Sequence, residues 1–464
     1  MISKLGEKFS DLFRKNMPDA FVFALLLTLL IGGIALATLP IDFFELLDAW
    51  YKGFWMLLEF GMQMVLLIVT GYTIALSPYV SKQINRLTHF IKTPTQVYFF
   101  VTLFGLLASI ISWGWVVVAA VLARTLAQKV KGIHYPFLIA CAYFSNNSWS
   151  TGLSSSIPLL LNTDANYLIE SNILQQTIST SITLGSVLNI SIMLLYIIVT
   201  PLLMLALSPK SSDRHELIDF LDTTVQKEVT IKEEAEIQTL SSWALSDKLN
   251  NSFILVLIIG IFGAIYVVRH FVMKGFDLNL NIMIFIFILI GLLLHQSPIR
   301  FGIAMRKTSS NISSILFQFP FYAGIMGIMI NTGLGENLAA SLSKIATVDS
   351  YPFFAFLLGG VVNFAIPSGG GEFAVIGPSV LDAVKTIGAG LPQETITQML
   401  SRASLSIAYG ESLTNLLQPF YLLLVLPIMG AGTKIQARDV MGYLVIPFVV
   451  YFILQSILVV YIPL

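Results

Sequence analysis

The chain has 464 residues, of which 56% are hydrophobic and only 11% are charged. Soluble domains carry about 25% charged residues, so this composition excludes an ordinary soluble protein and indicates that lipid surrounds much of the chain. Lysine plus arginine and aspartate plus glutamate number 26 each, a balance that gives no sign of nucleic-acid binding. The single cysteine, Cys141, excludes an internal disulfide, and five scattered histidines without HExxH spacing argue against a zinc hydrolase.

The N-terminal segment is basic and then apolar. The apolar run over 20–37 is longer than the roughly 7–15 residues of a signal-peptide core, so we interpret it as a retained first span. The preceding residues, 1–16, are predicted to form an amphipathic helix on the cytoplasmic surface.

Further apolar segments follow at the length of about 20 residues that a spanning helix needs. Some of them are broken by polar or glycine-rich clusters, at 96–127, 136–160 and 351–429. We predict uninterrupted spans at 19–39, 54–76, 180–207, 253–272, 279–295, 314–331 and 440–462.

Basic and acidic loops alternate, and this sets the orientation because positively charged loops stay in the cytoplasm. The loops 78–95 and 124–131 are basic, whereas 40–52 and 161–176 are acidic. We therefore predict a cytoplasmic N-terminus, about nine full crossings plus two re-entrant hairpins, and a periplasmic C-terminus. The long polar stretch 208–250 is expected to be a solvated cytoplasmic linker.

The apolar stretch 96–123 lies between two basic segments that both belong in the cytoplasm. The simplest arrangement is a re-entrant hairpin that turns near Ser112-Trp113-Gly114 and returns to the same side. Two ordinary short helices remain the alternative. Irregular backbone at membrane depth is tolerated only inside protein or beside water, so a turn here would lie at a site.

The two halves of the chain repeat the same order of elements, each with a hairpin followed by a broken helix. One span between the halves inverts the second, and inverted repeats with broken helices at the midplane mark transporter binding sites. We therefore predict an all-α polytopic membrane protein built from inverted repeats. The expected units are a first half at 1–207, with its hairpin at about 96–124 and broken helix at about 136–160, a linker at 208–250, and a second part at 251–464, with its hairpin at about 351–383 and broken helix at about 398–429.

The second hairpin contains Pro367 followed by Ser368 and the triplet Gly369-Gly370-Gly371. Proline and three glycines cannot continue a helix without cost, so backbone N–H groups are freed there. A small anion would satisfy them, because glycine lets the backbone approach closely and a helix N-terminus carries partial positive charge. A proline-kinked helix with small packing residues is the alternative.

Hydroxyl and amide side chains gather in both broken helices, at Ser145, Asn146, Asn147 and Ser148 and again at Thr414 and Asn415. They offer oxygens for a cation or donors for a carboxylate. Two acids, Glu372 and Glu411, are predicted at membrane depth, where a carboxyl group is costly unless it is paired, protonated or bound to a cation. A purely structural hydrogen bond is the alternative for each.

These residues resemble the short-chain fatty acid transporter family, the bacterial acetoacetate and butyrate uptake type, within the ion-transporter superfamily. The resemblance covers nearly the whole chain and implies inverted repeats and elevator-like movement of a transport domain. The chain departs from the family pattern at Glu372, Phe373, Leu413 and Tyr421, so the exact substrate stays open. The motifs that carry it include Trp113-Gly114, Asn363-Phe364-Ala365-Ile366-Pro367-Ser368-Gly369-Gly370-Gly371, Ala408-Tyr409-Gly410-Glu411 and Gln418-Pro419-Phe420.

We predict a secondary active transporter, not an enzyme, that takes up short-chain carboxylates by symport with a proton or Na⁺ across the bacterial inner membrane. The chain has no G-x-x-x-x-G-K-[ST] motif for ATP, so an ion gradient or the substrate's own gradient must supply the energy. Another small organic anion such as a dicarboxylate, or a passive carboxylate channel, remains the alternative. Expected partners are the carboxylate and membrane lipid, with a homodimer left open, and Na⁺ is the only candidate cofactor.

The residues expected to carry the function all come from the broken segments, and none is a certain metal ligand. For substrate binding we select Ser112, Trp113, Asn146, Asn147, Ser368, Gly369, Gly370, Gly371, Glu372, Thr414 and Asn415, and for ion coupling Glu411, Ser145 and Ser148.

Overall fold

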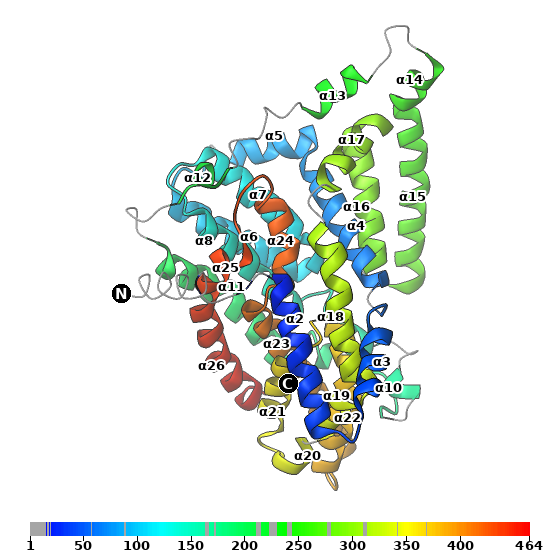
Figure 1. The fold of residues 1–464 in the computed structure, drawn as a ribbon, viewed down its shortest axis with the longest axis vertical. Coiled ribbons are helices and arrows are strands. Elements are labelled where there is room, and N and C mark those ends of the chain that lie inside the picture. Colours follow the sequence, from blue (N-terminus) through cyan, green and yellow to red (C-terminus); the bar gives the residue numbers. More distant parts are fainter. Residues whose placement is uncertain are drawn as a thin grey trace.

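The chain folds into an almost entirely helical molecule, shown by the computed structural model in Figure 1. The amphipathic helix expected at 1–16 lies, except for Lys15, outside the described residues. The structure describes residues 15, 18, 20–56, 58–87, 90–162, 167–170, 173–209, 215–221, 230–238, 244–275, 280–309, 313–340, 342–367 and 369–464.

The uninterrupted spans predicted from the sequence are helices in the structure. One begins later than expected: residues 180–182 form a 3-10 turn, and the helix starts after Ser186, whose Oγ accepts from the N–H of Asn189. The corresponding helices are α2 (Ala20–Thr38), α4 (Leu58–Ala75), α11 (Val187–Leu207), α15 (Phe253–Lys274), α16 (Leu280–His295), α18 (Ser313–Asn331) and α26 (Val445–Tyr461), the last preceded by α25 (Ala437–Met441) and η6 (Gly442–Leu444).

Within the described part of the chain, five helical segments are long and apolar enough to cross a membrane. They are α2, α6, α11, α15 and the run Ala437–Tyr461, and the bent pair formed by α23 and α24 makes a sixth. The protein is therefore a multi-pass membrane protein. Four shorter apolar helices, in α4, α16, α18 and α21, would raise the number of crossings, so the expected total of about nine stays a prediction.

The first predicted hairpin consists of α6 (Pro94–Ile111), η1 (Trp113–Trp115) and α7 (Val116–Lys129). The helix ends at the predicted turn because Ser112 adopts an extended backbone, with φ −158° and ψ 135°. The N–H of Trp113 then donates to Ser154 Oγ at 2.8 Å. Since α6 alone has the length of a span, the re-entrant path stays a prediction.

The other three interruptions also fall where the sequence indicated. The chain leaves α21 (Tyr351–Val362) at Asn363 and resumes as α22 (Gly369–Ile387). Helix α8 (Tyr135–Phe144) tightens into η2 (Ser145–Thr151) before α9 (Ser156–Leu161). Helix α23 (Gln393–Thr414) passes through η5 (Asn415–Leu417) and bends by 43° into α24 (Leu422–Met429).

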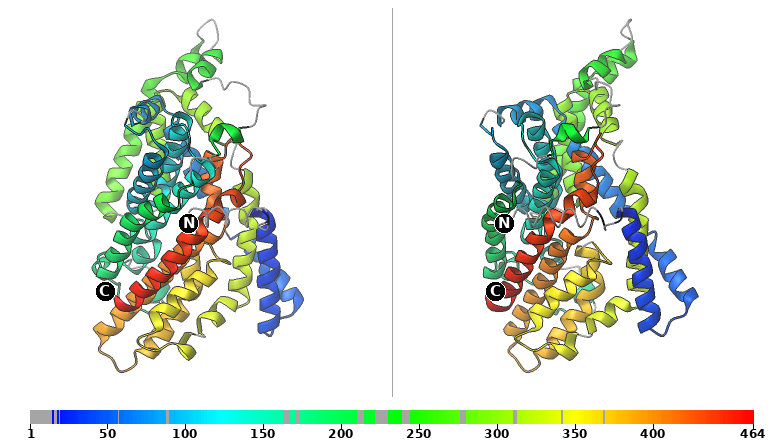
Figure 2. Two further views of the ribbon diagram at one scale, coloured as in Figure 1. Left: turned by 90° about the vertical axis from the view of Figure 1, so that its left-hand side faces the viewer. Right: turned by 60° about the vertical axis from the view of Figure 1, so that its left-hand side comes forward.

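Apolar side chains face outward and small residues let helices approach closely, as expected where lipid is the solvent. Helix α15 exposes Ile254, Ile258 and Phe262. Helices α21 and α23 pack so tightly that a Cβ on Gly410 would overlap the carbonyl oxygen of Phe356. Figure 2 shows α2 on one flank of the molecule, where α18 contacts both α2 and α3 (Phe43–Gly53).

The described parts of the linker make specific contacts and are more than a solvated connector. The carboxylate of Glu216 accepts from the N–H of Gly132 at 2.7 Å, just before α8. Glu234 forms ion pairs with Arg306 and Lys307 of α17 (Pro298–Ser309) at 3.7 and 3.3 Å. The linker helices are α12 (Leu217–Phe220), α13 (Ile231–Ile237) and α14 (Leu245–Asn250); α13 and α14 lie at the end of the molecule opposite α20 (Leu342–Ile345) in Figure 1.

The first testable prediction concerns topology. We expect a reporter that is active only in the cytoplasm to work when fused before Met1, and one that is active only in the periplasm to work when fused after Leu464. Both fusions should be made on the full chain, and expression of each should be matched by immunoblot. A cytoplasmic C-terminus would remove the inverted relation between the two halves.

Candidate functional site

The two broken helices meet at their breaks. Asn147 of η2 donates from Nδ2 to the carbonyl oxygen of Ser412 at 2.9 Å, and Ser412 Oγ donates to the carbonyl oxygen of Asn147 at 3.1 Å. The hydroxyl of Tyr143 donates to the carbonyl oxygen of Asn415 at 2.6 Å. Carbonyls that a broken helix leaves without an i+4 donor thus find partners on the other broken helix.

Asn363 connects the break between α21 and α22 to the break after α23. Its Nδ2 donates to Thr414 Oγ1 at 2.9 Å and to Asn415 Oδ1 at 2.8 Å. Gln418 Nε2 in turn donates to the carbonyl oxygen of Asn363 at 3.1 Å and to Asn415 Oδ1 at 3.0 Å. Asn363 thus binds the predicted residues Thr414 and Asn415, and Gln418 binds Asn415 as well. Neither Asn363 nor Gln418 was selected as a site residue from the sequence.

The start of α22 lies against Glu411. A Cβ on Gly369 would be 2.8 Å from Glu411 Oε2 and 3.2 Å from the ring of Trp149, so only glycine permits this approach without a shift. A Cβ on Gly370 would be 3.9 Å from Ser156 of α9, which is ordinary contact. We call residues 369–372 the α22 tip. Ser368, also predicted to bind substrate, lies outside the described residues.

Both predicted acids are fully buried. Glu411 Oε1 accepts a long hydrogen bond from Asn415 Nδ2 at 3.5 Å. Among the described residues, no side chain or backbone group bonds to Glu411 Oε2 or to either carboxyl oxygen of Glu372. The two carboxyls lie near enough to interact electrostatically. Since a buried carboxyl without a partner is costly, these atoms point to a bound proton, cation or ligand.

Aromatic side chains connect this acidic region to the first predicted hairpin. Trp113 contacts Tyr421 edge-on with ring centroids 5.7 Å apart, and Tyr421 lies within electrostatic range of both Glu372 and Glu411. Phe420 stacks on Phe319 at 4.8 Å. In the sequence, Tyr421 stood out only as a departure from the family pattern. Its position directly after the Gln-Pro-Phe motif could have marked it as a candidate site residue.

The remaining predicted residues of the first half hold α6 against η2. Ser148 Oγ donates to the carbonyl oxygen of Leu106 at 2.8 Å, and Ser109 Oγ donates to Asn146 Oδ1 at 3.1 Å. Ser145 Oγ donates to the carbonyl oxygen of Ala142 at 2.7 Å. Hydrogen bonds to the protein therefore explain these hydroxyls without a bound ion. Their role in Na⁺ coupling stays a prediction. Within the described residues, no group of three His, Cys, Asp or Glu side chains could hold a metal.

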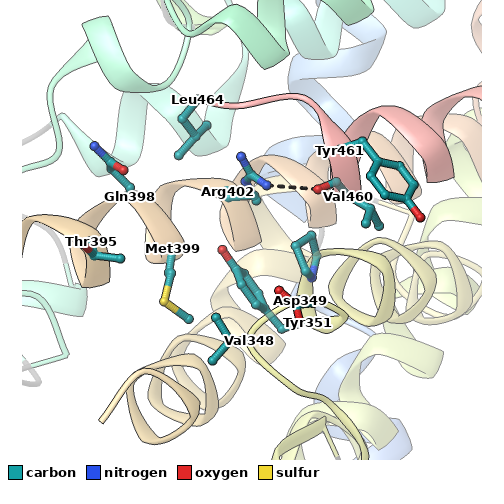
Figure 3. A pocket seen from close by; sticks show the side chains of 11 residues that line it. Val348, Asp349, Tyr351, Thr395, Gln398, Met399, Arg402, Val460, Tyr461 and Leu464 are labelled. Atoms are coloured by element: carbon teal, nitrogen blue, oxygen red, sulfur yellow. Dashed lines mark hydrogen bonds between the residues drawn. The ribbon is translucent and has the colours of Figure 1, made fainter. Parts of the chain in front are cut away.

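Two arginines cap helix ends away from the carboxyls. Arg124 of α7 donates to the carbonyl oxygens of Ile428, Met429 and Ala431 at 2.6 to 2.9 Å. Arg402 of α23 donates to those of Val460 and Ile462, and it lines a cavity of about 400 Å³ (Figure 3). Arg402 precedes Glu411 by nine residues, which is about 14 Å along a helix, so this cavity is separate from the acidic region.

A multi-pass membrane protein whose broken helices meet around buried carboxyls has the construction of a transporter. A model of the short-chain fatty acid transporter family matches residues 1–462. A protein of Escherichia coli (strain K12) that carries the name of a short-chain fatty acid transporter is 37% identical over 446 residues, covering 96% of each chain. A protein of Haemophilus influenzae with the same name is 36% identical over 455 residues, again covering 96% of each.

The chain belongs to the short-chain fatty acid transporter family, which confirms the resemblance drawn from its motifs. It is accordingly a transporter and not an enzyme. Two solved structures are loosely similar. The YdaH transporter of Alcanivorax borkumensis is 17% identical with a TM-score of 0.45, covering 96% of this chain and 98% of that one. MtrF of Neisseria gonorrhoeae is 16% identical with a TM-score of 0.44, covering 97% and 96%.

The second prediction tests the amide connection between the breaks. Replacing Asn363 with Ala should destabilise the protein by about 1–3 kcal/mol, because the buried Thr414 Oγ1 and Asn415 Oδ1 lose the donor Asn363 Nδ2. Asn331→Ala, which removes one long bond at an exposed helix end, should cost less than about 0.5 kcal/mol. Thermal unfolding in detergent measures both. Equal shifts in the two variants would contradict the assigned role of Asn363.

Proposed function

We propose that the protein takes up short-chain fatty acids across a bacterial inner membrane by symport with a proton. The observation that carries the proposal is the fully buried carboxyl of Glu411, held where the α22 tip meets the broken helix α23. Family membership supports the substrate class. A homodimer is the assembly we propose, in which paired static parts would support the moving ones.

Charge balance supports a coupled cation. A short-chain fatty acid carries one negative charge, and moving it inward against an interior-negative potential costs about 2.3 kcal/mol per 100 mV. One proton carried with the substrate cancels this charge. Glu411 would bind that proton with the substrate and release it on the inner side. Na⁺ held by the hydroxyls of Ser145 and Ser148 with Asn146 is the alternative carrier.

We place the substrate carboxylate between the predicted hairpin tips and the two breaks. Backbone N–H groups of the α22 tip, with the amides of Asn146, Asn147 and Asn415, would be its donors, and the aromatic contact of Trp113 with Tyr421 would adjoin the alkyl chain. Among the described residues, no arginine or lysine forms an ion pair with Glu372 or Glu411. A dicarboxylate would bring a second negative charge beside these acids, so a monocarboxylate fits better.

Movement of the substrate is proposed to follow the elevator pattern. The moving unit would contain both predicted hairpins and both broken helices, from α6 to α9 and from α21 to α24. The static unit would contain α2, α4, α16 and α18. The numerous bonds between the two broken helices support treating them as one body.

The third prediction tests the placement of the carboxylate. Replacing Gly370 with Val should abolish uptake, because the added side chain prevents the anion from approaching the backbone of the α22 tip. The protein should still fold, since a Cβ at this position has its nearest neighbour at 3.9 Å. Gly33→Val in α2, which would meet nothing within 4 Å, should transport normally. Normal uptake of labelled butyrate by Gly370→Val would contradict the proposed position of the substrate carboxylate.

The fourth prediction tests the coupling ion. In proteoliposomes, Glu411→Gln should still exchange labelled butyrate but should lose accumulation driven by a pH gradient, because a neutral amide cannot carry the proton. Glu394→Gln, an exposed acid at the start of the same helix, is the matched control and should behave like the parent.

Other outcomes of this experiment separate the alternatives. Retained pH-driven accumulation by Glu411→Gln would rule out the carrier role. Loss of both activities in a folded variant would favour a structural role for Glu411. Strict Na⁺ dependence of the parent would move coupling to the hydroxyl cluster, and failure to concentrate substrate under any ion gradient would favour a channel.

A further inference from the structure

We infer that Glu372 and Glu411 form one proton-binding pair, and that a proton on this pair is required for the α22 tip to stay in contact with α23 and α9. Glu372 is thereby a positioning residue whose protonation controls closure of the tip over the substrate. The inference rests on the proposed function for its place in the transport cycle and deepens it by adding a second carboxyl to the coupling site.

The first observation is that both acids are buried while most of their carboxyl oxygens have no hydrogen-bond partner. Each has no exposed surface, and three of their four carboxyl oxygens have no hydrogen-bond partner among the described residues. The sequence alone left open that Glu372 faces water, but the structure places it in the interior. Two ionised carboxylates within electrostatic range of each other and away from water are unstable, because each lacks solvation and repels the other. At least one must therefore be neutral in this closed arrangement.

The second observation is the position of the pair at a contact. Glu372 lies in the first turn of α22, and Glu411 lies on α23 directly against Gly369 of the same turn. On its other side the tip lies close to α9, where Ser156 is the nearest neighbour of a Cβ on Gly370. If both carboxyls ionise, repulsion acts between the tip and α23 and separates these two elements.

Glu372 and Glu411 are the acidic groups that can gain or lose a proton at the contact between the tip and α23. Glu411 is the charged group that acts on it, and the hydroxyl of Tyr421, itself beside Tyr143, is the third polar group in range. Helix α9 has no titratable residue. On α22 itself and on α19, α20 and α21 the other titratable residues are the exposed Glu336, Lys344 and Asp382, the half-buried Lys385 at the far end of α22, and Tyr351 beside Arg402. Helix α23 adds the exposed Glu394 at its start and the buried Tyr409, whose hydroxyl donates to Asn189 Oδ1.

A cycle follows from this arrangement. On the outer side, a proton on the pair lets the tip close over the bound carboxylate, and the protonated carboxyl can donate a hydrogen bond to it. On the inner side, loss of the proton leaves two carboxylates and the substrate anion together. Their mutual repulsion opens the tip and releases the substrate. Proton release and substrate release are then one event.

The test measures access to the tip directly. Cys141, the single cysteine, is buried and is first replaced with alanine. A cysteine is then introduced as Ser156→Cys, at a half-buried position of α9 next to the tip, in the full chain in proteoliposomes. Its rate of reaction with a membrane-impermeant thiol reagent is measured against pH. The rate is divided by that of Gln393→Cys, at an exposed helix start, which corrects for the reagent's own pH dependence. The ratio should rise with pH, by up to about tenfold per pH unit, the limit for release of one proton.

Adding Glu372→Gln or Glu411→Gln to Ser156→Cys should make this ratio independent of pH, because a single carboxyl next to an amide has no like charge to repel. The tip then opens and closes equally at every pH, as exchange of labelled substrate requires. If Ser156→Cys does not fold, the conservative change Ser155→Cys, at a buried position beside it at the start of α9, is the second reporter. A ratio that does not change with pH in the natural pair overturns the inference. An equal pH dependence in Glu372→Gln overturns it as well.

This outcome is independent of the coupling ion. If uptake proves to be driven by Na⁺ while the labelling ratio follows pH, the proposed coupling fails and the proton-dependent contact stands. If the ratio responds to Na⁺ at constant pH and not to pH itself, the contact is controlled by a cation other than the proton and the inference is wrong.

Discussion

The structure depends on one constraint: a backbone that leaves its helix inside a bilayer must find hydrogen-bond partners within the protein. The chain breaks its helices at Ser112, in η2, after Val362 and in η5. In the two halves these breaks are brought together, so that the carbonyls of Asn147, Ser412 and Asn415 are satisfied across the molecule. The polar interior needed for transport is thus also what allows the broken helices to exist.

The acids at positions 372 and 411 are the least satisfied groups at the breaks. The described structure offers their carboxyls a single long hydrogen bond. The side-chain oxygens of Asn363 and Gln418 also have no partner, but the amide nitrogen of each of these residues does. Buried acceptors without donors are suited to a partner that binds and dissociates. In the proposed symport that partner is a cation, because two acids and an anionic substrate would otherwise repel one another.

Much of the fold could be predicted from the sequence, because apolar length and interruption by proline, glycine and polar clusters are local properties. The breaks and most of the helices fall within a few residues of their predicted positions, whereas α11 begins at Val187 and not at residue 180. The site was only partly predictable. Thr414 and Asn415 lie at the break, and their role in substrate binding stays a prediction. Their partner Asn363 is far away along the chain, and Gln418 looks like an ordinary helix-end residue. Pairing across 50 residues depends on tertiary packing, which periodicity does not encode.

The helix caps made by Arg124 restrict how the two halves can move. Its guanidinium joins α7 to the end of α24, and the hydroxyl of Tyr135 in α8 donates to the same carbonyl of Met429 at 2.7 Å. Together with the bonds between the breaks, this ties the first half of the chain to the second at two depths. A mechanism in which the halves rock apart would have to break both sets of bonds in every cycle. If the two halves moved together as one rigid body, both sets of bonds would stay intact. The binding site would then keep its geometry while it became accessible from the other side of the membrane.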